Sequence, residues 1–220
     1  MSNVDLILGT DHARKRAVRT EPTQRRSSQR LDALLDAAAE IVDEVGFERL
    51  TTQMVAERAG ASIGTVYRYF PDRVAVLHAL RERSVRRYRE RVADLFDGAE
   101  LEGWWHAVEL AVDACIDLYR DEPGFGVVHG SERELSDDGL EPEFADRLAS
   151  VIEAEFGEVA DGEELRFRLG IAIELVDSLV NRAFTRDPEG DERYLREAKR
   201  VVRDYLEDVL EVHRRVESAA

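Results

Sequence analysis

The sequence predicts an all-α protein made of a three-helix unit near the N-terminus and a larger helical unit behind it. Apolar residues recur at three- and four-residue steps through most of the 220 residues, which is the period of an α-helix. Residues that favour helices are common, and only five prolines are present. Glycines and prolines separate the periodic stretches, and roughly nine helices are expected in all.

The chain is expected to begin with an arm and then a long helix. Residues 1–27 show no lasting periodicity and contain several arginines, so they are predicted to form a flexible basic arm. Ser27 or Ser28 can cap a helix whose apolar residues recur up to Val45, and Gly46 is suited to end it.

Two short helices are expected within residues 51–70. Thr51 is a suitable N-cap for the first, and Gly60 breaks that helix after about two turns. Ser62 can cap the second, which Pro71 stops because the residue before a proline avoids the helical conformation. Two short helices joined by a turn that contains glycine form a helix-turn-helix.

The rest of the chain is predicted to be helical in six stretches: residues 72–96, 103–119, 125–135, 142–156, 163–184 and 192–216. The last two have broad apolar faces, which can pack within one subunit or against a second copy of the chain.

The formal net charge of −16 is unevenly spread. Residues 1–96 carry 17 Lys and Arg against 14 Asp and Glu, whereas residues 97–220 carry 14 against 33. A polyanion is therefore expected to bind to residues 1–96. The acidic residues of 97–220 can simply keep the protein soluble. Cys115 is the only cysteine, and no apolar stretch approaches the ~20 residues of a membrane span. We expect a cytoplasmic protein that binds no membrane.

The stretch from Ala59 to Pro71 contains no acid, although acids outnumber bases in the chain. If Val66 and Phe70 face inward, five residues remain at the surface: Gly64, Thr65, Tyr67, Arg68 and part of Tyr69. Arginine can donate to guanine or phosphate, and hydroxyls can bond phosphate, whereas an acid would be repelled. The free N–H groups at Ser62 also suit an anion. A DNA-binding surface is favoured over an exposed helical hairpin without a ligand.

Other chemistry has little support in the sequence. His106, Cys115 and His129 are not spaced like metal ligands, and no phosphate loop or catalytic constellation is present. We expect no enzyme activity, metal or cofactor. A helical enzyme, and a ligand-binding or interaction module without DNA recognition, remain the competing classes.

Four pieces of residues 28–88 follow one another in order: a helix ending in EVGFERLTT, the turn AERAGAS, the helix IGTVYRYFPDR and a long helix that starts VAVL. Together they resemble the N-terminal domain of the TetR family of transcriptional regulators. The extent of the resemblance implies an arm (1–27), a helix-turn-helix domain (28–88) and a C-terminal domain (89–220). The resemblance implies an all-helical homodimer whose N-terminal helices bind operator DNA and whose C-terminal domain binds a small-molecule effector. It implies a regulator, most simply a repressor that the effector releases from its operator.

The resemblance also implies which residues meet DNA. Thr51 or Thr52 would contact phosphate. The second short helix would supply Ser62, Gly64, Thr65, Tyr67, Arg68 and Tyr69. Arg73 stands where lysine is frequent in the family. Ile63 departs from the family pattern, because a polar or basic residue is common at its position. Arg25, Arg26 and Arg30 can reach phosphate or a minor groove, or can only add nonspecific attraction.

For the C-terminal domain, the resemblance implies a dimer through residues 163–184 and 192–216 and an effector pocket among the helices before them. Eight residues are candidates to line that pocket: Trp105, Cys115, Tyr119, Phe125, His129, Phe144, Glu174 and Asn181. The sequence indicates neither the chemical class of the effector nor the operator sequence.

Overall fold

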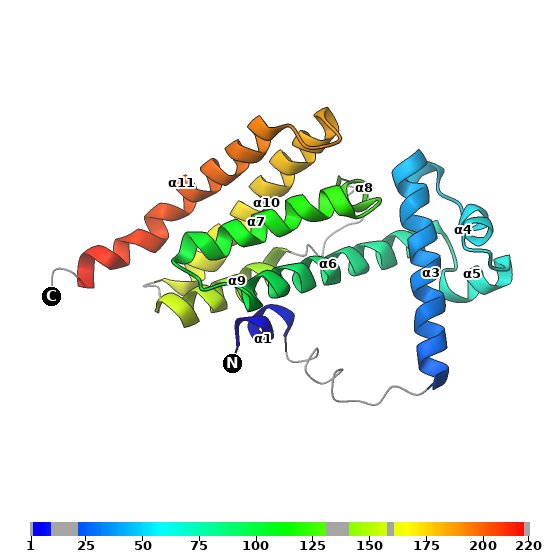
Figure 1. The fold of residues 1–220 in the computed structure, drawn as a ribbon, viewed down its shortest axis with the longest axis horizontal. Helices are drawn as coiled ribbons and strands as arrows, with labels where there is room; N and C mark the ends of the chain where they lie inside the picture. Colours follow the sequence, from blue (N-terminus) through cyan, green and yellow to red (C-terminus); the bar gives the residue numbers. More distant parts are fainter. Residues whose placement is uncertain (1, 10–21, 131–140, 158–160, 218–220) are drawn as a thin grey trace. The chain divides into compact units, whose positions relative to one another are not determined.

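The computed structural model describes residues 2–9, 22–130, 141–157 and 161–217. Within these ranges it contains ten α-helices, one short 3-10 helix and no strand (Figure 1). The all-α prediction is therefore confirmed. About nine helices were expected from periodicity. The additional one is α1 (Asn3–Leu8), which lies in the stretch predicted to be a flexible arm.

The chain divides into two compact units. The helix-turn-helix unit comprises Arg16–Arg87 and Asp121–Asp137, and the bundle unit comprises Met1–Lys15, Tyr88–Arg120 and Asp138–Ala220. The long helix α6 (Arg73–Asp97) contributes to both units. The sequence places a domain boundary at residue 88 but does not anticipate that residues 121–137 belong with the helix-turn-helix unit.

Helix α3 (Pro22–Val45) begins earlier than predicted. Ser27 and Ser28 lie inside it, so the prediction that one of them caps this helix is wrong. A proline fits the first position of a helix, because its missing N–H would have no partner there. Together with α1, the start of α3 makes two parts of the predicted arm helical, and residues 10–21 lie outside the described residues. The helix ends at Val45 as predicted, and Gly46 follows with a φ of +81°.

Helix α3, the 3-10 helix η1 (Phe47–Arg49), α4 (Thr52–Arg58), α5 (Ile63–Tyr69) and the start of α6 enclose one apolar core (Figure 1). Its fully buried residues include Leu34, Ile41, Val42, Leu50, Val55, Val66 and Leu77. At the edge of this core, Arg58 of α4 pairs with Glu40 (3.1 Å) and Glu44 (2.7 Å) of α3. The two short helices are therefore held on α3 by apolar burial and by charge.

A segment that is distant in sequence completes the helix-turn-helix unit. Helix α8 (Phe125–Gly130) packs on α3, and Val128 joins the apolar core. Just before α8, the N–H of Gly124 donates to an Asp43 carboxylate oxygen of α3 at 3.0 Å. The predicted helix over residues 125–135 is thus described only as far as residue 130, and it belongs to this unit.

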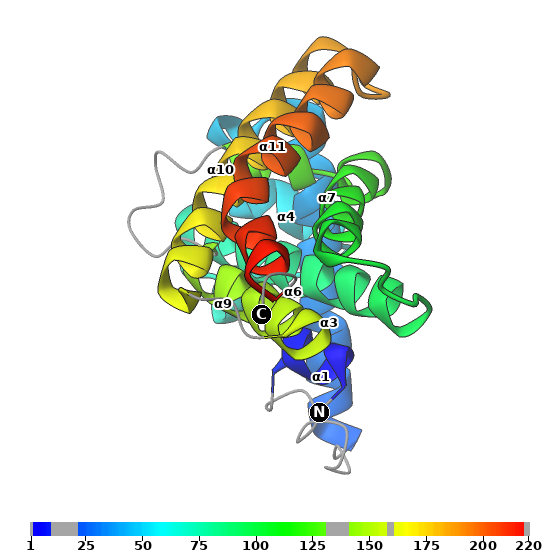
Figure 2. The ribbon, with the colours of Figure 1, turned by 90° about the vertical axis from the view of Figure 1, so that its left-hand side faces the viewer.

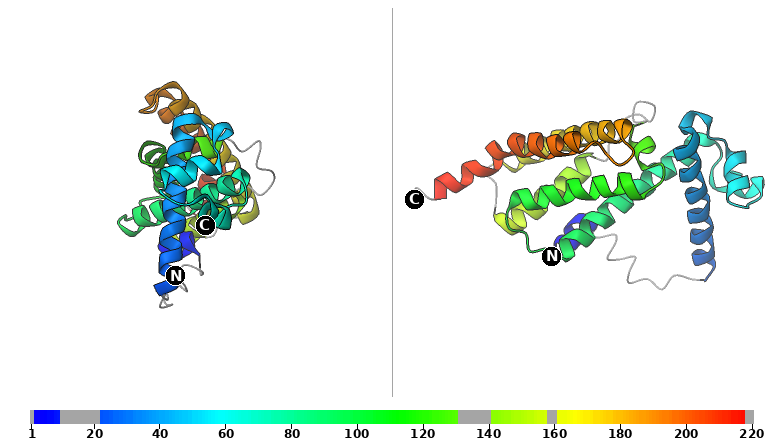
Figure 3. Two further views of the ribbon diagram at one scale, coloured as in Figure 1. Left: turned by 90° about the vertical axis from the view of Figure 1, so that its right-hand side faces the viewer. Right: turned by 45° about the horizontal axis from the view of Figure 1, so that its top comes forward.

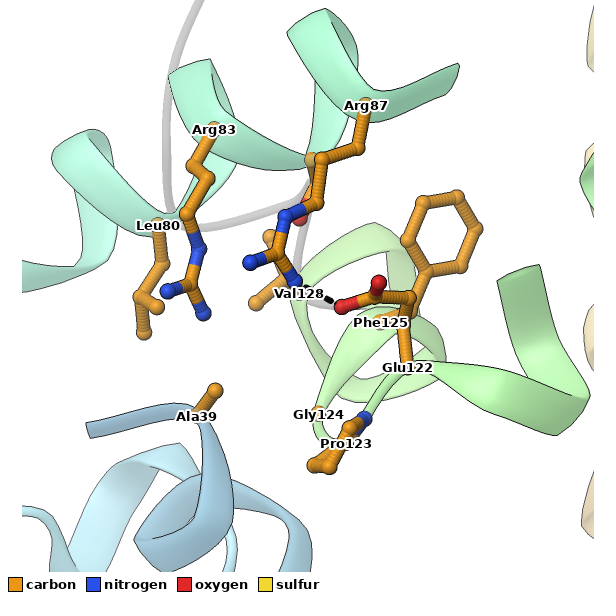
Figure 4. A pocket seen from close by; sticks show the side chains of 10 residues that line it. Ala39, Leu80, Arg83, Arg87, Glu122, Pro123, Gly124, Phe125 and Val128 are labelled. Atoms are coloured by element: carbon orange, nitrogen blue, oxygen red, sulfur yellow. Dashed lines mark hydrogen bonds and ion pairs between the residues drawn. The ribbon is translucent and has the colours of Figure 1, made fainter. Parts of the chain in front are cut away.

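A small cavity lies inside this unit, between α3, α6 and the segment that leads into α8 (Figure 4). Arg83 and Arg87 of α6 point toward it, and Arg87 forms an ion pair with Glu122 (Figure 4). Arg83 is buried and donates to Asp36 of α3 at 2.7 Å. The cavity therefore borders a charged contact that links three segments of one unit.

The bundle unit contains α7 (Trp104–Asp121), α9 (Glu141–Phe156), α10 (Gly162–Arg186) and α11 (Glu192–Glu217), with the end of α6. Helices α10 and α11 lie side by side (Figures 1 and 3), and α9 packs on α10 and on α1 (Figure 2). Lys199 of α11 pairs with Glu109 (3.2 Å) and Asp113 (2.7 Å) of α7. These helices start and end within about two residues of the predicted positions, which is the usual uncertainty of helix ends. None of the described helices is both long and apolar enough to cross a bilayer.

Candidate nucleic-acid interface

The turn between α4 and α5 has the geometry that its sequence predicts. Thr51 caps α4, because its Oγ1 accepts a backbone N–H from the first turn at 3.2 Å. At the other end of α4, Gly60 has a φ of +59°, and its N–H donates to the Glu57 carbonyl at 3.3 Å. The next N–H, of Ala61, donates to the Ala56 carbonyl at 2.9 Å. This pair of hydrogen bonds is a Schellman motif, which ends a helix at a glycine.

Helix α5 has one buried and one exposed face. Ser62 caps it, because its Oγ accepts the N–H of Thr65 at 3.2 Å and lies 2.9 Å from the Thr65 hydroxyl. Val66 has 0% of its surface exposed and Phe70 is buried, whereas Tyr67 is 54% exposed. Val66 and Phe70 therefore face inward, as the predicted DNA surface requires.

The other residues predicted on this surface are accessible to differing degrees. Gly64 and Arg68 are exposed, Thr51 is exposed at the start of α4, and Thr52 is half-buried. Ile63 packs against the apolar core. The position at which the resemblance suggests a polar side chain is therefore part of the hydrophobic packing here.

Tyr69 connects α5 to α3. Its hydroxyl lies within hydrogen-bond distance of the Ser27 hydroxyl, and the guanidinium of Arg68 lies 5.2 Å from the centre of its ring. The hydrogen bond with Ser27, and then the neighbouring Arg68 and Arg30, lower the pKa of Tyr69. The end of α5 is thus held in place by α3 rather than by its own helix alone.

Arg73, at the start of α6, is exposed but not free to turn. Its Nη1 donates to the Glu48 carbonyl at 3.0 Å, and its guanidinium lies 5.6 Å from the centre of the Phe47 ring. A carbonyl bond and a cation–π contact orient an arginine without neutralising its charge. Arg73 therefore presents a positioned cation close in sequence to α5.

The three arginines predicted to reach DNA from the arm lie on α3. Arg26 and Arg30 are exposed there, while the side chain of Arg25 lies outside the described residues. Ser27, which the sequence offers only as a cap, lies between Arg26 and Arg30 and touches Tyr69. No local pattern signals that role, because the contact joins residues 42 positions apart.

In the bundle unit, the predicted effector residues Cys115 and Phe144 lie close to two residues that were not predicted, Asp177 and Tyr88. Cys115 is buried, and its Sγ lies 4.0 Å from an Asp177 carboxylate oxygen. Tyr88 donates to the Ala111 carbonyl at 3.1 Å, and its ring centre lies 4.8 Å from that of Phe144. Burial, and then the neighbouring Asp177, raises the pKa of the Cys115 thiol. The one available signal for Asp177 is that an acid interrupts the apolar face of α10.

Two further predicted effector residues make aromatic contacts. Tyr119 stacks on Phe184 with ring centres 5.0 Å apart. Trp105 lies under the guanidinium of Arg203, at 5.6 Å from the ring centre. Both contacts lie in the bundle unit and link α7 to α10 and α11.

The remaining predicted effector residues are dispersed. Asn181 is half-buried and Glu174 is exposed, both on α10. Phe125 is buried in the helix-turn-helix unit, where it lines the small cavity, and the side chain of His129 lies outside the described residues. In the part of the chain that the structure describes, no three His, Cys, Asp or Glu side chains gather as metal ligands.

The described residues form a helix-turn-helix unit and a helical bundle unit, which is an architecture of helix-turn-helix DNA-binding proteins. Residues 34–80 match the family model for bacterial regulatory proteins of the tetR family, and residues 102–210 match the model for the tetracyclin repressor-like C-terminal domain. A crystal structure of a TetR-family regulator from Streptomyces coelicolor is 35% identical, with a TM-score of 0.70 over 82% of this chain and 99% of that one. The chain belongs to the TetR family.

Curated relatives agree with this assignment. The repressor KstR2 of Rhodococcus jostii is 31% identical over 70% of this chain and 76% of its own length. The repressor DrrR1 of Streptomyces coeruleorubidus is 35% identical over 50% of this chain. The chain spans 40% of the length of DrrR1, and 35% and 30% of the KstR repressors of Mycolicibacterium smegmatis and R. jostii.

Proposed function

We propose that this protein is a transcriptional repressor that binds operator DNA with α5, as the recognition helix, in the major groove. The observation that carries the proposal is the orientation of α5. Its buried Val66 fixes which face is exposed, and that face presents Tyr67 and Arg68 beside a helix start whose N–H groups suit phosphate. The relatives named above are called repressors, which supports the sign of regulation.

Around the recognition helix, the remaining predicted contacts act on the DNA backbone. Thr51 and Thr52 lie at the start of α4, Arg73 is oriented by Glu48 and Phe47, and the arginines of α3 add positive charge. Phosphate contacts set the position of the protein on the duplex, and base contacts from Arg68 give specificity. This function places the protein in the cytoplasm, where operator DNA lies.

The bundle unit would hold the effector and the dimer interface. Tyr88, Cys115, Phe144 and Asp177 form a mixed aromatic and polar cluster in that unit, and we assign the effector site to it. Helices α10 and α11 form the dimer interface. In one state of the dimer, the two recognition helices do not match the spacing of the half-sites. An effector that binds this state more tightly lowers the affinity for the operator, by at most the ratio of its affinities for the two states.

The double substitution of Tyr67 and Arg68 by alanine tests DNA binding. Both side chains are exposed, so the fold should survive while the affinity for a duplex that the wild type selects from a random pool falls on the order of 100-fold. Fluorescence anisotropy measures the affinity, and Arg86→Ala, which removes an exposed arginine of α6 outside the predicted DNA contacts, is the matched control. Unchanged affinity in the double variant would leave a helical interaction module without specific DNA recognition.

A further inference from the structure

The exposed face of α5 contains a glycine that the fold itself does not require. Gly64 is exposed within the helix, and a Cβ added to it would meet only the Ser62 hydroxyl oxygen, at 4.0 Å. Gly64 is not among the glycines with a positive φ, so its backbone conformation is open to other residues. Glycine inside a helix is destabilising relative to alanine. The reason for this glycine therefore lies outside the packing of the protein.

The next residue, Thr65, has its hydroxyl turned toward the start of the helix. Thr65 Oγ1 lies 2.9 Å from the Ser62 hydroxyl oxygen, which also accepts the Thr65 N–H at 3.2 Å. Threonine has few χ1 positions in a helix, so this contact fixes the side chain. Because the hydroxyl and the methyl group leave Cβ in different directions, the methyl group remains for a contact with DNA.

Gly64 and Thr65 share one face of α5 with the exposed Arg68. They precede Arg68 by four and three positions, which places the three residues on the same side of a helix. Ile63, by contrast, packs against the apolar core. The first half of the exposed face therefore offers a Cα without a side chain and a methyl group, and both are apolar.

One group on the major-groove edge of DNA matches such a surface. Thymine presents its C5 methyl group there, and the other groups that the bases present are hydrogen-bond donors or acceptors. A threonine methyl group is a usual partner of the thymine methyl group. A missing Cβ also allows another molecule to approach the backbone closely. Both residues therefore favour a thymine over the other bases.

We propose that Gly64 and Thr65 recognise one thymine in each half-site of the operator through its C5 methyl group. This inference rests on the proposed DNA binding, which it deepens by naming a base. The choice of base then depends on the methyl group of Thr65 and not on its hydroxyl. A Cβ at position 64 occupies the space that the thymine needs.

A scan of the DNA tests the contact. The probe is a duplex that the wild type selects from a random pool, in which each thymine is replaced in turn by deoxyuridine. Deoxyuridine pairs in the same way but lacks the C5 methyl group. At one thymine of each half-site, the replacement should weaken binding of the wild type by about 2- to 5-fold. Fluorescence anisotropy measures each affinity.

Two substitutions of Thr65 assign this loss to its methyl group. Thr65→Ser keeps the hydroxyl and removes the methyl group, so deoxyuridine at the same position should no longer weaken binding. Thr65→Val keeps a methyl group and removes the hydroxyl. Whatever its overall affinity, this variant should keep the wild-type ratio of affinities for thymine and deoxyuridine. The opposite pattern would make Thr65 a phosphate contact and would overturn the proposal.

Substitution of Gly64 should have two effects of opposite sign. Gly64→Ala should raise the midpoint of thermal unfolding by roughly 2–4 °C, because alanine favours the helix and its Cβ meets open space. The same Cβ should lower the affinity for the selected duplex roughly 5- to 100-fold, because it overpacks the contact with the base. Gly98→Ala is the matched control, because Gly98 is exposed in the bundle unit and a Cβ there would meet nothing within 4 Å.

The outcomes separate this contact from the proposed function. A wild type that binds its selected duplex without loss at any deoxyuridine would overturn the thymine contact and leave the DNA binding intact. Unchanged affinity in Gly64→Ala would do the same. A loss that persists in Thr65→Ser would also overturn it, because another side chain, such as the exposed Tyr67, would then meet the methyl group. A wild type that selects no duplex would contradict the proposed DNA binding, and the thymine contact with it.

Discussion

The hydroxyl of Ser27 on α3 lies 3.1 Å from the hydroxyl of Tyr69 at the end of α5. This contact joins the first helix of the helix-turn-helix unit to the helix that we assign to the major groove. Because Tyr69 also carries the guanidinium of Arg68 over its ring, the position of Arg68 depends on α3. The side chains of Tyr69 and Arg68 are therefore already positioned in the protein without DNA.

Ser27→Ala tests that dependence. The substitution removes one neutral, exposed hydrogen bond, which should change the free energy of unfolding by about 1 kcal/mol or less. Affinity for the selected duplex should fall about 2- to 10-fold, because Tyr69 and Arg68 lose a fixed position. Anisotropy titration and thermal unfolding measure the two effects, with the exposed Gln29→Ala as control. An unchanged affinity would show that Tyr69 is positioned without Ser27.

A substitution at Gly124 tests how closely the segment that precedes α8 packs on α3. Its φ is +72°, and a side-chain Cβ there would lie 2.8 Å from the Ala39 carbonyl oxygen. Gly124→Ala should lower the free energy of unfolding by about 2–4 kcal/mol, through backbone strain and overpacking. Gly60→Ala is the matched control, because its φ is +59° but a Cβ would meet nothing within 4 Å. That variant should lose only about 1 kcal/mol. Equal losses in chemical denaturation would contradict a close approach at Gly124.

Glu143 predicts a pH dependence of stability. Its hydrogen bonds with Arg147, then Arg89, lower its pKa in the folded chain. A carboxyl with a lowered folded-state pKa adds stability above its unfolded pKa, near 4.3, and that contribution is lost as the pH falls through the folded value. Glu143→Gln should therefore be less stable than the wild type at pH 7, and the difference should shrink below about pH 4.3.

Thermal unfolding of both chains between pH 7 and pH 3 measures this difference. The exposed Glu100→Gln, between α6 and α7, is the control for removing one acid from a chain of net charge −16. The difference in stability between the wild type and Glu143→Gln could instead stay constant from pH 7 to pH 3. That result would show that the charge of Glu143 does not contribute to stability.

How far the sequence predicts this fold depends on the range of the contacts involved. The caps at Thr51 and Ser62 and the glycine ends at Gly46 and Gly60 are set by neighbours within a few residues, so local pattern suffices for them. The start of α3 is different. Ser27 has the chemistry of a cap, but Pro22 starts the helix and Ser27 is used across the unit instead.

The same limit explains the other differences. Helix α1 has six residues and packs on α9, and the hydrogen bond from Arg147 of α9 to the Leu6 carbonyl joins positions 141 apart in the chain. Gly124 joins the helix-turn-helix unit through Asp43, across 81 positions. For the candidate site, the helical period correctly places Val66 inward and Tyr67 outward. The cluster around Asp177 is set by the packing of four helices, which no local pattern encodes.

The last prediction concerns the dimer. Phe167 on α10 is the most exposed of the large apolar side chains that the structure describes, at 63%. If α10 and α11 meet a second copy, Phe167 becomes buried, and Phe167→Asp should weaken the dimer on the order of 10- to 100-fold. Val74→Asp is the matched control, because Val74 is 44% exposed but lies in the helix-turn-helix unit. Sedimentation across a dilution series measures the dissociation. Because paired half-sites need two recognition helices, operator affinity should fall with dimer affinity in Phe167→Asp. A Phe167→Asp chain that stays dimeric at every concentration would move the interface away from α10.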